Sequence, residues 1–348
     1  MGDSVTSARR LSPRTFLITL SSLLVAVAIV HLGWVPVGPG FGAVWRAFAS
    51  LFGGEQGDAL DREIVLQLRL PRLLVAVFGG ASLGLAGTVM QAAFRNPLAS
   101  PDVVGTAAGA AFGGAVAIAS GFAMASALAA PIAAMFGSTI VTALVFVFAG
   151  AGARFSVAGL LLAGVAMNTM IGALTTFVVT FTVDNYTASS SVLFWLMGGL
   201  DAQSWTKAFI TVVGFVGFGL PLVFRARDLD LLTLQDDSAY SLGLDVAQAR
   251  RWLLWFACGL TAATVANTGG IAFLGLVVPH LSRLLVGPAH RVLLPASALA
   301  GAVVLLAADI VCRNAPIANL RLGVVTSLLG TPYFLYLLRR HRRGEALR

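Results

Sequence analysis

Residues 69–110 read RLPRLLVAVFGGASLGLAGTVMQAAFRNPLASPDVVGTAAGA, and this stretch decides the fold. Between 70 and 93 the only charge is Arg72, near the start, so the segment is long and apolar enough to cross about 30 Å of hydrocarbon as a helix. A turn with Pro97 and Pro101 follows, and a second apolar segment begins near 103. Repeated glycines are typical of helices that approach one another closely in a membrane. The stretch therefore predicts two membrane helices joined by a turn.

The composition of the whole chain agrees with this interpretation. Of 348 residues, 58% are hydrophobic and 11% are charged, whereas soluble domains are about 25% charged. Disordered chains are polar and charged, which excludes disorder. The apolar runs are too long and unbroken for the alternating strands of an outer-membrane barrel. The sequence therefore predicts an all-α polytopic membrane protein with a single transmembrane domain over 15–338.

Ten candidate spans follow from the hydropathy of the chain. They lie near 15–35, 70–93, 103–120, 125–149, 157–182, 204–224, 252–268, 271–287, 293–312 and 322–338. The first is longer than the apolar region of a signal peptide, so we interpret it as a retained anchor. We expect an amphipathic interfacial segment within 36–62, a short helix at 191–198 and a polar cytoplasmic segment at 225–251.

The basic residues predict the orientation. With the N-terminus inside and ten spans, 16 basic residues fall on the inner side and 7 on the outer side. Cytoplasmic loops carry the excess of Lys and Arg, so both ends are predicted to be cytoplasmic, with tails at 1–14 and 339–348. This role of the arginines also favours a membrane protein over a nucleic-acid-binding one.

Several kinds of chemistry are missing from the sequence. A P-loop needs Gly-x-x-x-x-Gly-Lys-Ser/Thr, but the only lysine is Lys207, and no glycine loop precedes it. Cys258 and Cys312 fit no metal or disulfide framework. We therefore expect no catalytic residues, no metal and no cofactor on this chain.

Few ionisable or amide side chains lie at membrane depth. Asp309 and Arg313 are spaced as a helical ion pair, which favours a structural role over an ion site. His280 follows Pro279 and is interpreted as a residue of a helix kink rather than a gate. Asn168 is expected to bond to a neighbouring helix, with a channel-facing role as the alternative. Ion-coupled carriers use such residues, so their scarcity disfavours that class.

Three further stretches are distinctive, and with 69–110 they carry a resemblance. They read GGIAFLGLVVPHLSRLLVGPAHRVLLPASALAGA at 269–302, LRLGVVTSLLGTPYFLYLL at 320–338 and LLLAGVAMN at 160–168. Together they closely resemble, in order, the permease subunits of bacterial ABC importers for iron siderophores, haem and cobalamin. The resemblance covers the chain from about residue 60 onward. It implies ten spans in the bacterial inner membrane.

The resemblance also implies partners. The chain would form a homodimer, two separate ATPase subunits holding ATP and Mg would dock on the cytoplasmic side, and a periplasmic binding protein would deliver the substrate. The polar segment 225–251 would carry the coupling contact. Its candidate residues are Leu231, Leu232, Asp236, Asp237, Ser238 and Gly243, where the three polar residues are expected to cap a short helix and Gly243 to end it.

Docking, gating and lining residues are carried over in the same way. Arg69, Arg72 and Arg313 match arginines that pair with the binding protein in the cobalamin relative. Asn96 and Leu98 match one cytoplasmic gate, whereas Val157 and Ala158 replace small hydroxylated residues at the other. The expected pathway-lining residues are Met90, Gln91, Met167, Asn168, Thr175 and Phe181.

The cargo is the least determined feature. Arg321 stands where many relatives have other residues, and an extra external arginine suits the propionates of haem. We therefore rank haem first, ferric siderophore second and cobalamin third. An ion-coupled secondary carrier and a structural membrane subunit or channel are the alternatives from other classes.

Overall fold

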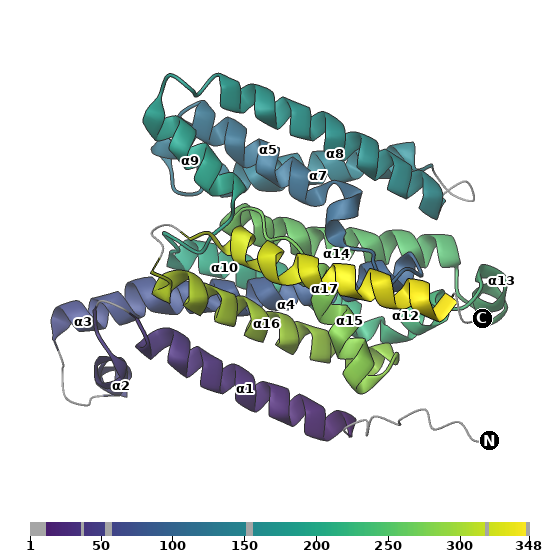
Figure 1. Ribbon diagram of the computed structural model, residues 1–348, viewed down its shortest axis with the longest axis horizontal. Helices are drawn as coiled ribbons and strands as arrows, with labels where there is room; N and C mark the ends of the chain where they lie inside the picture. Colours follow the sequence, from purple (N-terminus) through teal and green to yellow (C-terminus); the bar gives the residue numbers. More distant parts are fainter. Residues whose placement is uncertain (1–11, 36–37, 53–57, 151–155, 317–319, 346–348) are drawn as a thin grey trace.

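The computed structural model describes residues 12–35, 38–52, 58–150, 156–316 and 320–345, and the described part of the chain is helical (Figure 1). Ten helical segments follow the ten predicted spans in order. They are α1 (Pro13–Gly33), α4 (Leu70–Ala93), α5 (Thr106–Ala119), α7 (Ala129–Phe148), α8 (Val157–Thr180), α10 (Trp205–Gly214) continued by η5 (Phe215–Gly219) and α11 (Leu220–Phe224), α14 (Val246–Thr268), α15 (Leu274–Val286), α16 (His290–Asn314) and α17 (Leu322–Glu345).

Not all of these segments could cross a membrane by length and composition alone. Within the described residues, 6 helices meet both criteria. α5, α15 and the apolar part of α17 are shorter, and α14 is long enough but is not among the 6. The all-helical polytopic architecture is confirmed, and ten is an approximate number of spans.

The remaining helices are short connections. They are α2 (Phe41–Ala49), η1 (Ser50–Phe52), α3 (Ala59–Glu63), η2 (Ile64–Arg69), η3 (Pro101–Val104), α6 (Phe122–Ala125), α9 (Tyr186–Leu196), α12 (Ala226–Leu232) and α13 (Asp236–Ser241). The amphipathic α2 lies where an interfacial segment was predicted, and Trp45 on it is exposed.

Helix boundaries differ from the predictions where a local signal overrides hydropathy. α14 begins at Val246, before the predicted 252, because the Asp245 carboxylate accepts a hydrogen bond from the Gln248 amide at 2.9 Å and caps the helix. α9 begins at Tyr186 rather than 191, where Asn185 caps it in the same way. α17 continues past 338 to Glu345, so part of the predicted tail is helical.

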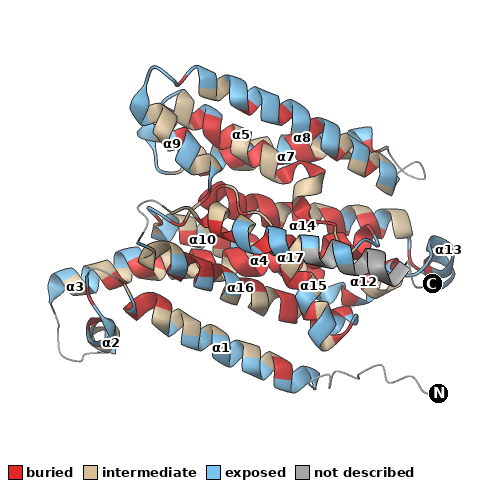
Figure 2. Cartoon of the chain, viewed as in Figure 1, coloured by how far each residue is buried: buried red, intermediate tan, exposed pale blue. Residues whose placement is uncertain are grey.

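Helix α4 is the centre of the fold. Every residue from Gly79 to Ala93 is buried, and the ribbons around the α4 label at the centre of Figure 2 are mostly coloured as buried. It packs on α16, α14 and α15. A Cβ at Gly80 or Gly84 would collide with the backbone of α16, at Gly301 and Ser297. These glycines allow the two backbones to approach closely.

A second group of helices lies beside this one. α5 packs on α7, α8 and α9, and α14 contacts both α5 and α7 (Figure 1). The start of α1, the end of α17 and the helices α12 and α13 lie at one end of the bundle, and α2 and α3 lie at the other. The first described helix therefore begins, and the last one ends, on the same side as α12 and α13 of the polar segment 225–251.

The α4–α16 contact makes a direct prediction. Gly84→Val should destabilise the protein by at least about 1–3 kcal/mol, because the added side chain has no space beside the Ser297 carbonyl. Thermal unfolding in detergent measures the effect. Gly217→Ala is the control, since a Cβ there meets open space. Equal unfolding temperatures for the two variants would contradict the packing.

Candidate functional site

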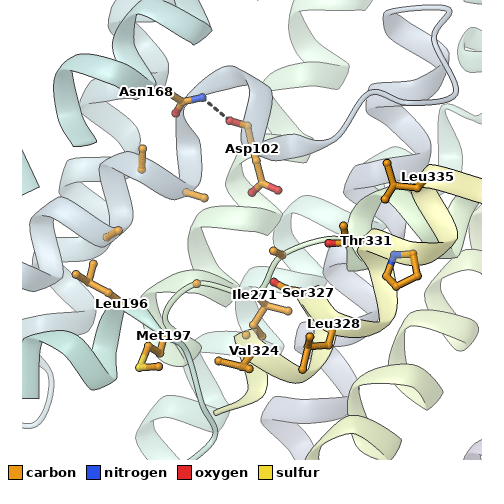
Figure 3. Close-up of a pocket in the computed structure, with 17 residues that line it drawn as sticks. Asp102, Asn168, Leu196, Met197, Ile271, Val324, Ser327, Leu328, Thr331 and Leu335 are labelled. Carbon is orange, nitrogen blue, oxygen red and sulfur yellow. Dashed lines mark hydrogen bonds between the residues drawn. The ribbon is translucent and has the colours of Figure 1, made fainter. Parts of the chain in front are cut away.

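A large cavity lies between the two groups of helices. It has a volume of about 980 Å³ and is bordered by η3 and α5, by α8 and α9, by residues 270–272 and by α17 (Figure 3). Its wall is mostly apolar. The polar side chains on it are Asp102, Asn168, Ser327 and Thr331. A space of this size and character suits a large, mostly apolar ligand that few polar groups orient.

One wall of the cavity is fixed by a contact between η3 and α8. The Asn168 side-chain amide donates to the backbone carbonyl of Asp102 at 2.9 Å (Figure 3). A Cβ at Gly164 would meet the Val103 carbonyl, so α8 approaches η3 closely. Asn168 thus bonds to a neighbouring element, as expected, and also borders the cavity.

The other predicted lining residues do not border this cavity. Met90 and Gln91 are buried in α4, and Gln91 donates to the Leu276 carbonyl at 3.0 Å. Met167 is buried in the core, and the Thr175 hydroxyl donates to the Ile171 carbonyl at 2.8 Å. Phe181 is exposed and lies edge-on to Phe177.

Apart from Asn168, sequence reasoning missed the residues that border the cavity. Gly323, Ser327 and Thr331 lie on one face of α17, and their spacing of four is a visible signal of a small, polar helix face. Asp102 is the only carboxylate between Glu63 and Asp184, which is a second signal.

The outer arginines form a connected cluster. Arg72 holds Asp309 through two hydrogen bonds, from Nε to Oδ2 at 2.9 Å and from Nη2 to Oδ1 at 2.7 Å. His31 Nε2 lies 2.8 Å from Asp309 Oδ2, and Arg313 Nε lies 3.4 Å from the same oxygen. Asp309 is 1% exposed, so this carboxylate is the buried counter-ion of two arginines. The interpretation of Asp309 as half of an ion pair with Arg313 agrees with this geometry, which adds Arg72 and His31.

The three predicted docking arginines differ in accessibility. Arg69 is 6% exposed, and its Nη1 donates to the carbonyls of Leu32 and Pro39 at 2.6 Å, which ties α1 to η2. Arg72 and Arg313 keep part of their side chains accessible. Beside them, Arg321 pairs with Asp201 and lies over the Phe194 ring at 3.9 Å.

The predicted coupling segment forms α12 and α13. Leu229 and Leu232 are buried and Leu231 is half-buried, so these leucines anchor α12 on the bundle. Asp230 ties α12 to the start of α16, with Oδ1 at 2.7 Å from His290 Nδ1. The residues on the open surface include Leu234, Asp237, Ser238, Tyr240 and Leu242.

Helix α13 begins and ends close to the predicted positions. Gln235 occupies the N-cap position, so Asp236, Asp237 and Ser238 form the first turn rather than a cap. Gly243 adopts φ 87° directly after the helix, and a Cβ there would meet open space. Gly243 therefore ends the helix by its backbone conformation.

Asp236 is held by two arginines from elsewhere in the fold. Its Oδ1 accepts hydrogen bonds from Arg250 Nη2, at 3.0 Å, and from Arg95 Nη2. Partial burial alone would raise the pKa of Asp236, but the hydrogen bonds from Arg250 and Arg95 outweigh it and lower that pKa. Such a contribution to stability is present at neutral pH and is lost only as the pH falls below the ordinary carboxyl range, about 4.

The two predicted gates lie at the same end of the bundle. Asn96 Oδ1 accepts a hydrogen bond from the Leu98 amide at 2.9 Å, which shapes the loop after α4. Val157 and Ala158 form the first turn of α8, capped by Ser156 Oγ. The neighbouring residues 151–155 lie outside the described residues.

The stability of the protein is predicted to depend strongly on Asp309, the buried carboxylate of the outer cluster. Asp309→Ala should lower the free energy of unfolding by about 3–5 kcal/mol, because two arginines lose their buried counter-ion. Asp201→Ala is the matched control, since that carboxylate is 61% exposed and its pairs should contribute below about 1 kcal/mol. Thermal unfolding in detergent distinguishes them, and equal losses would contradict a structural role for Asp309.

Comparison with known proteins shows the family to which the chain belongs. Residues 23–340 match the model of the FecCD transport family. The chain is 38% identical to the hemin transport system permease HmuU of Yersinia pestis, over 97% of this chain and 99% of the relative. It is 39% identical to the cobalamin import system permease BtuC of Halobacterium salinarum, over 90% and 84%.

The chain is also similar to a permease named for a different cargo and to a solved structure. The molybdate import system permease MolB of Haemophilus influenzae is 36% identical, over 93% of this chain and 95% of the relative. A solved inward-facing conformation of a metal-chelate type ABC transporter aligns with a TM-score of 0.81 and 34% identity, covering 94% of this chain and 99% of that one. The chain therefore belongs to the FecCD transport family and is a multi-pass membrane permease of the ABC importer class.

Proposed function

We propose that this chain moves an iron-containing chelate, with haem as the first candidate and a ferric siderophore as the second, from the periplasm to the cytoplasm. Movement would occur by alternating access in the bacterial inner membrane. The observation that carries the proposal is the apolar cavity of about 980 Å³ between η3 and α17, in a fold shared with a metal-chelate type ABC transporter.

Two relatives named for hemin and cobalamin support a large chelate as cargo. Cobalamin is the runner-up within the family. An ion-coupled carrier is the alternative from another class, and it would need available ionisable groups at membrane depth. Asp309 is already neutralised by Arg72 and Arg313, so it is not available for ion coupling, and Asp102 on the cavity wall is the carboxylate that this alternative would have to use.

The proposed assembly is a homodimer with two separate ATPase subunits and a periplasmic binding protein. ATP and Mg would bind to the ATPase subunits, and this chain would hold no cofactor. Much of α8 is exposed and apolar, including Leu162, Val165 and Phe177, and an apolar face of this kind suits a second copy or lipid.

Docking of the binding protein is proposed at Arg72 and Arg313, with Arg69 holding the outer ends of α1 and η2 in place. Charged surfaces speed association and lose effect as salt screens them. Alanine at Arg72 and Arg313 should weaken affinity for the binding protein at low ionic strength. Unchanged affinity in a binding titration would remove docking from the proposal.

The test of the cargo uses the complete transporter in liposomes. ATPase activity should be stimulated by the binding protein loaded with haem more strongly than by the same protein loaded with a ferric siderophore, cobalamin or molybdate. If another cargo stimulates the ATPase more strongly, that cargo takes the place of haem in the proposal, and the importer function still stands. Failure of the chain to co-purify with an ATPase subunit would contradict the importer itself.

Contact with the ATPase is proposed along α12 and α13, with Asp237, Ser238 and Gly243 on the exposed side. Charge reversal at Asp236 and Asp237, or Gly243→Val, should lower transport per ATP hydrolysed, because a side chain at φ 87° strains the end of α13. Arg62→Ala, an exposed substitution far away on α3, is the control. Transport equal to the parent in all coupling variants would remove α13 from the contact.

A further inference from the structure

Arg95 ends helix α4 in a backbone conformation that side chains rarely adopt. Its φ is 50°, and the helix closes around it with the Asn96 amide donating to the Gln91 carbonyl at 3.1 Å. Glycine is the usual residue at such a helix end, because a Cβ disfavours positive φ. An arginine at this position is therefore unexpected from the backbone alone, which directs attention to its side chain.

The Arg95 side chain reaches both helices of the proposed ATPase contact. Its Nε donates to the Leu232 carbonyl, at the last residue of α12, at 2.7 Å. Its Nη2 donates to Asp236, at the first residue of α13. The planar guanidinium thus holds two helix ends in a fixed relation, which the single ammonium of a lysine would not do.

The chain that follows Arg95 reaches the cavity wall within a few residues. The loop that follows is short and internally bonded, with the Ala99 amide donating to the Asn96 carbonyl at 3.1 Å and the Leu98 amide to Asn96 Oδ1. It enters η3, where Asp102 borders the cavity. Displacement of α12 and α13 would therefore reach the cavity wall through few flexible bonds.

We propose that Arg95 is a positioning residue that transmits movement of α12 and α13 to the loop 95–100 and so to the cavity wall at Asp102. The proposal rests on the proposed function, since it needs an ATPase that moves α12 and α13. Arg250, on α14, also binds Asp236. Through Asp236, Arg95 therefore connects the end of α4 to α14 as well as to α13.

A simpler role for Arg95 is the stabilisation of the end of α4, and the choice of variants separates the two roles. Arg95→Gly relaxes the backbone at positive φ, and Arg95→Asn tolerates it while being too short to reach Asp236. Both should keep the fold, because relief of the backbone strain offsets the hydrogen bonds that the Arg95 side chain no longer makes. Arg95→Lys keeps the charge without the two-point contact, so its coupling should lie between those of Arg95→Asn and the parent.

The experiment measures ATPase rate and cargo uptake on the same liposomes containing the complete transporter. Arg95→Gly and Arg95→Asn should retain ATP hydrolysis within about twofold while uptake per ATP falls about tenfold, a typical strength of coupling between two sites. Asp236→Ala should cause a similar fall, and combining it with Arg95→Asn should add little further loss. Arg291→Ala, which removes an exposed arginine on α16 at the same end, should match the parent.

Each outcome bears on the proposal. Parental uptake per ATP in both Arg95→Gly and Arg95→Asn would overturn it while leaving the importer intact. The proposal would also be overturned if the loss of uptake per ATP in the double variant equalled the product of the two single losses, since Arg95 and Asp236 would then act separately. Absence of ATP-dependent uptake by the parent would instead contradict the proposed function, so the two failures are distinguishable.

Discussion

The close approach of α4 to its neighbours is the constraint on which the rest of the structure depends. Gly80 and Gly84 face the backbone of α16, and Gly87 faces the backbone of α15 at Gly275. In a membrane, apolar burial gives little preference for helix–helix over helix–lipid contact, so close packing of small residues must hold the helices together. With α4 fixed, its outer end presents Arg72 to Asp309 and its inner end presents Arg95 to α12 and α13.

The two ends of α4 therefore use charge in different ways. At the outer end, a buried carboxylate joins α1, α4 and α16, and the cost of burying charge is offset by paired hydrogen bonds. At the inner end, the pairs around Asp236 are partly exposed and accessible to water. Exposed pairs contribute less to stability, which suits a contact that changes during a transport cycle. One helix thus connects a rigid outer cluster to a weaker inner one.

Hydropathy and charge were enough to predict the architecture of this chain. The span 70–93 agrees with α4 at both ends, and the predicted end of the short helix at Gly243 agrees with its positive φ. The bonding of Asn168 could also be predicted, because an amide inside an apolar helix needs a partner. Boundaries set by single caps, such as Asp245 before α14, are not visible to a hydropathy window.

The side-chain clusters could not be predicted, because they join residues far apart in the chain. His31 and Asp309 are separated by 278 positions, and Arg95 and Asp236 by 141. A lone sequence shows that each group is charged but not which opposite charge lies beside it. We propose that a separate ATPase drives cargo through this chain. Haem uptake into liposomes tests it most directly: it should require ATP, the ATPase subunit and the binding protein together, whereas uptake by this chain alone under an ion gradient would contradict it.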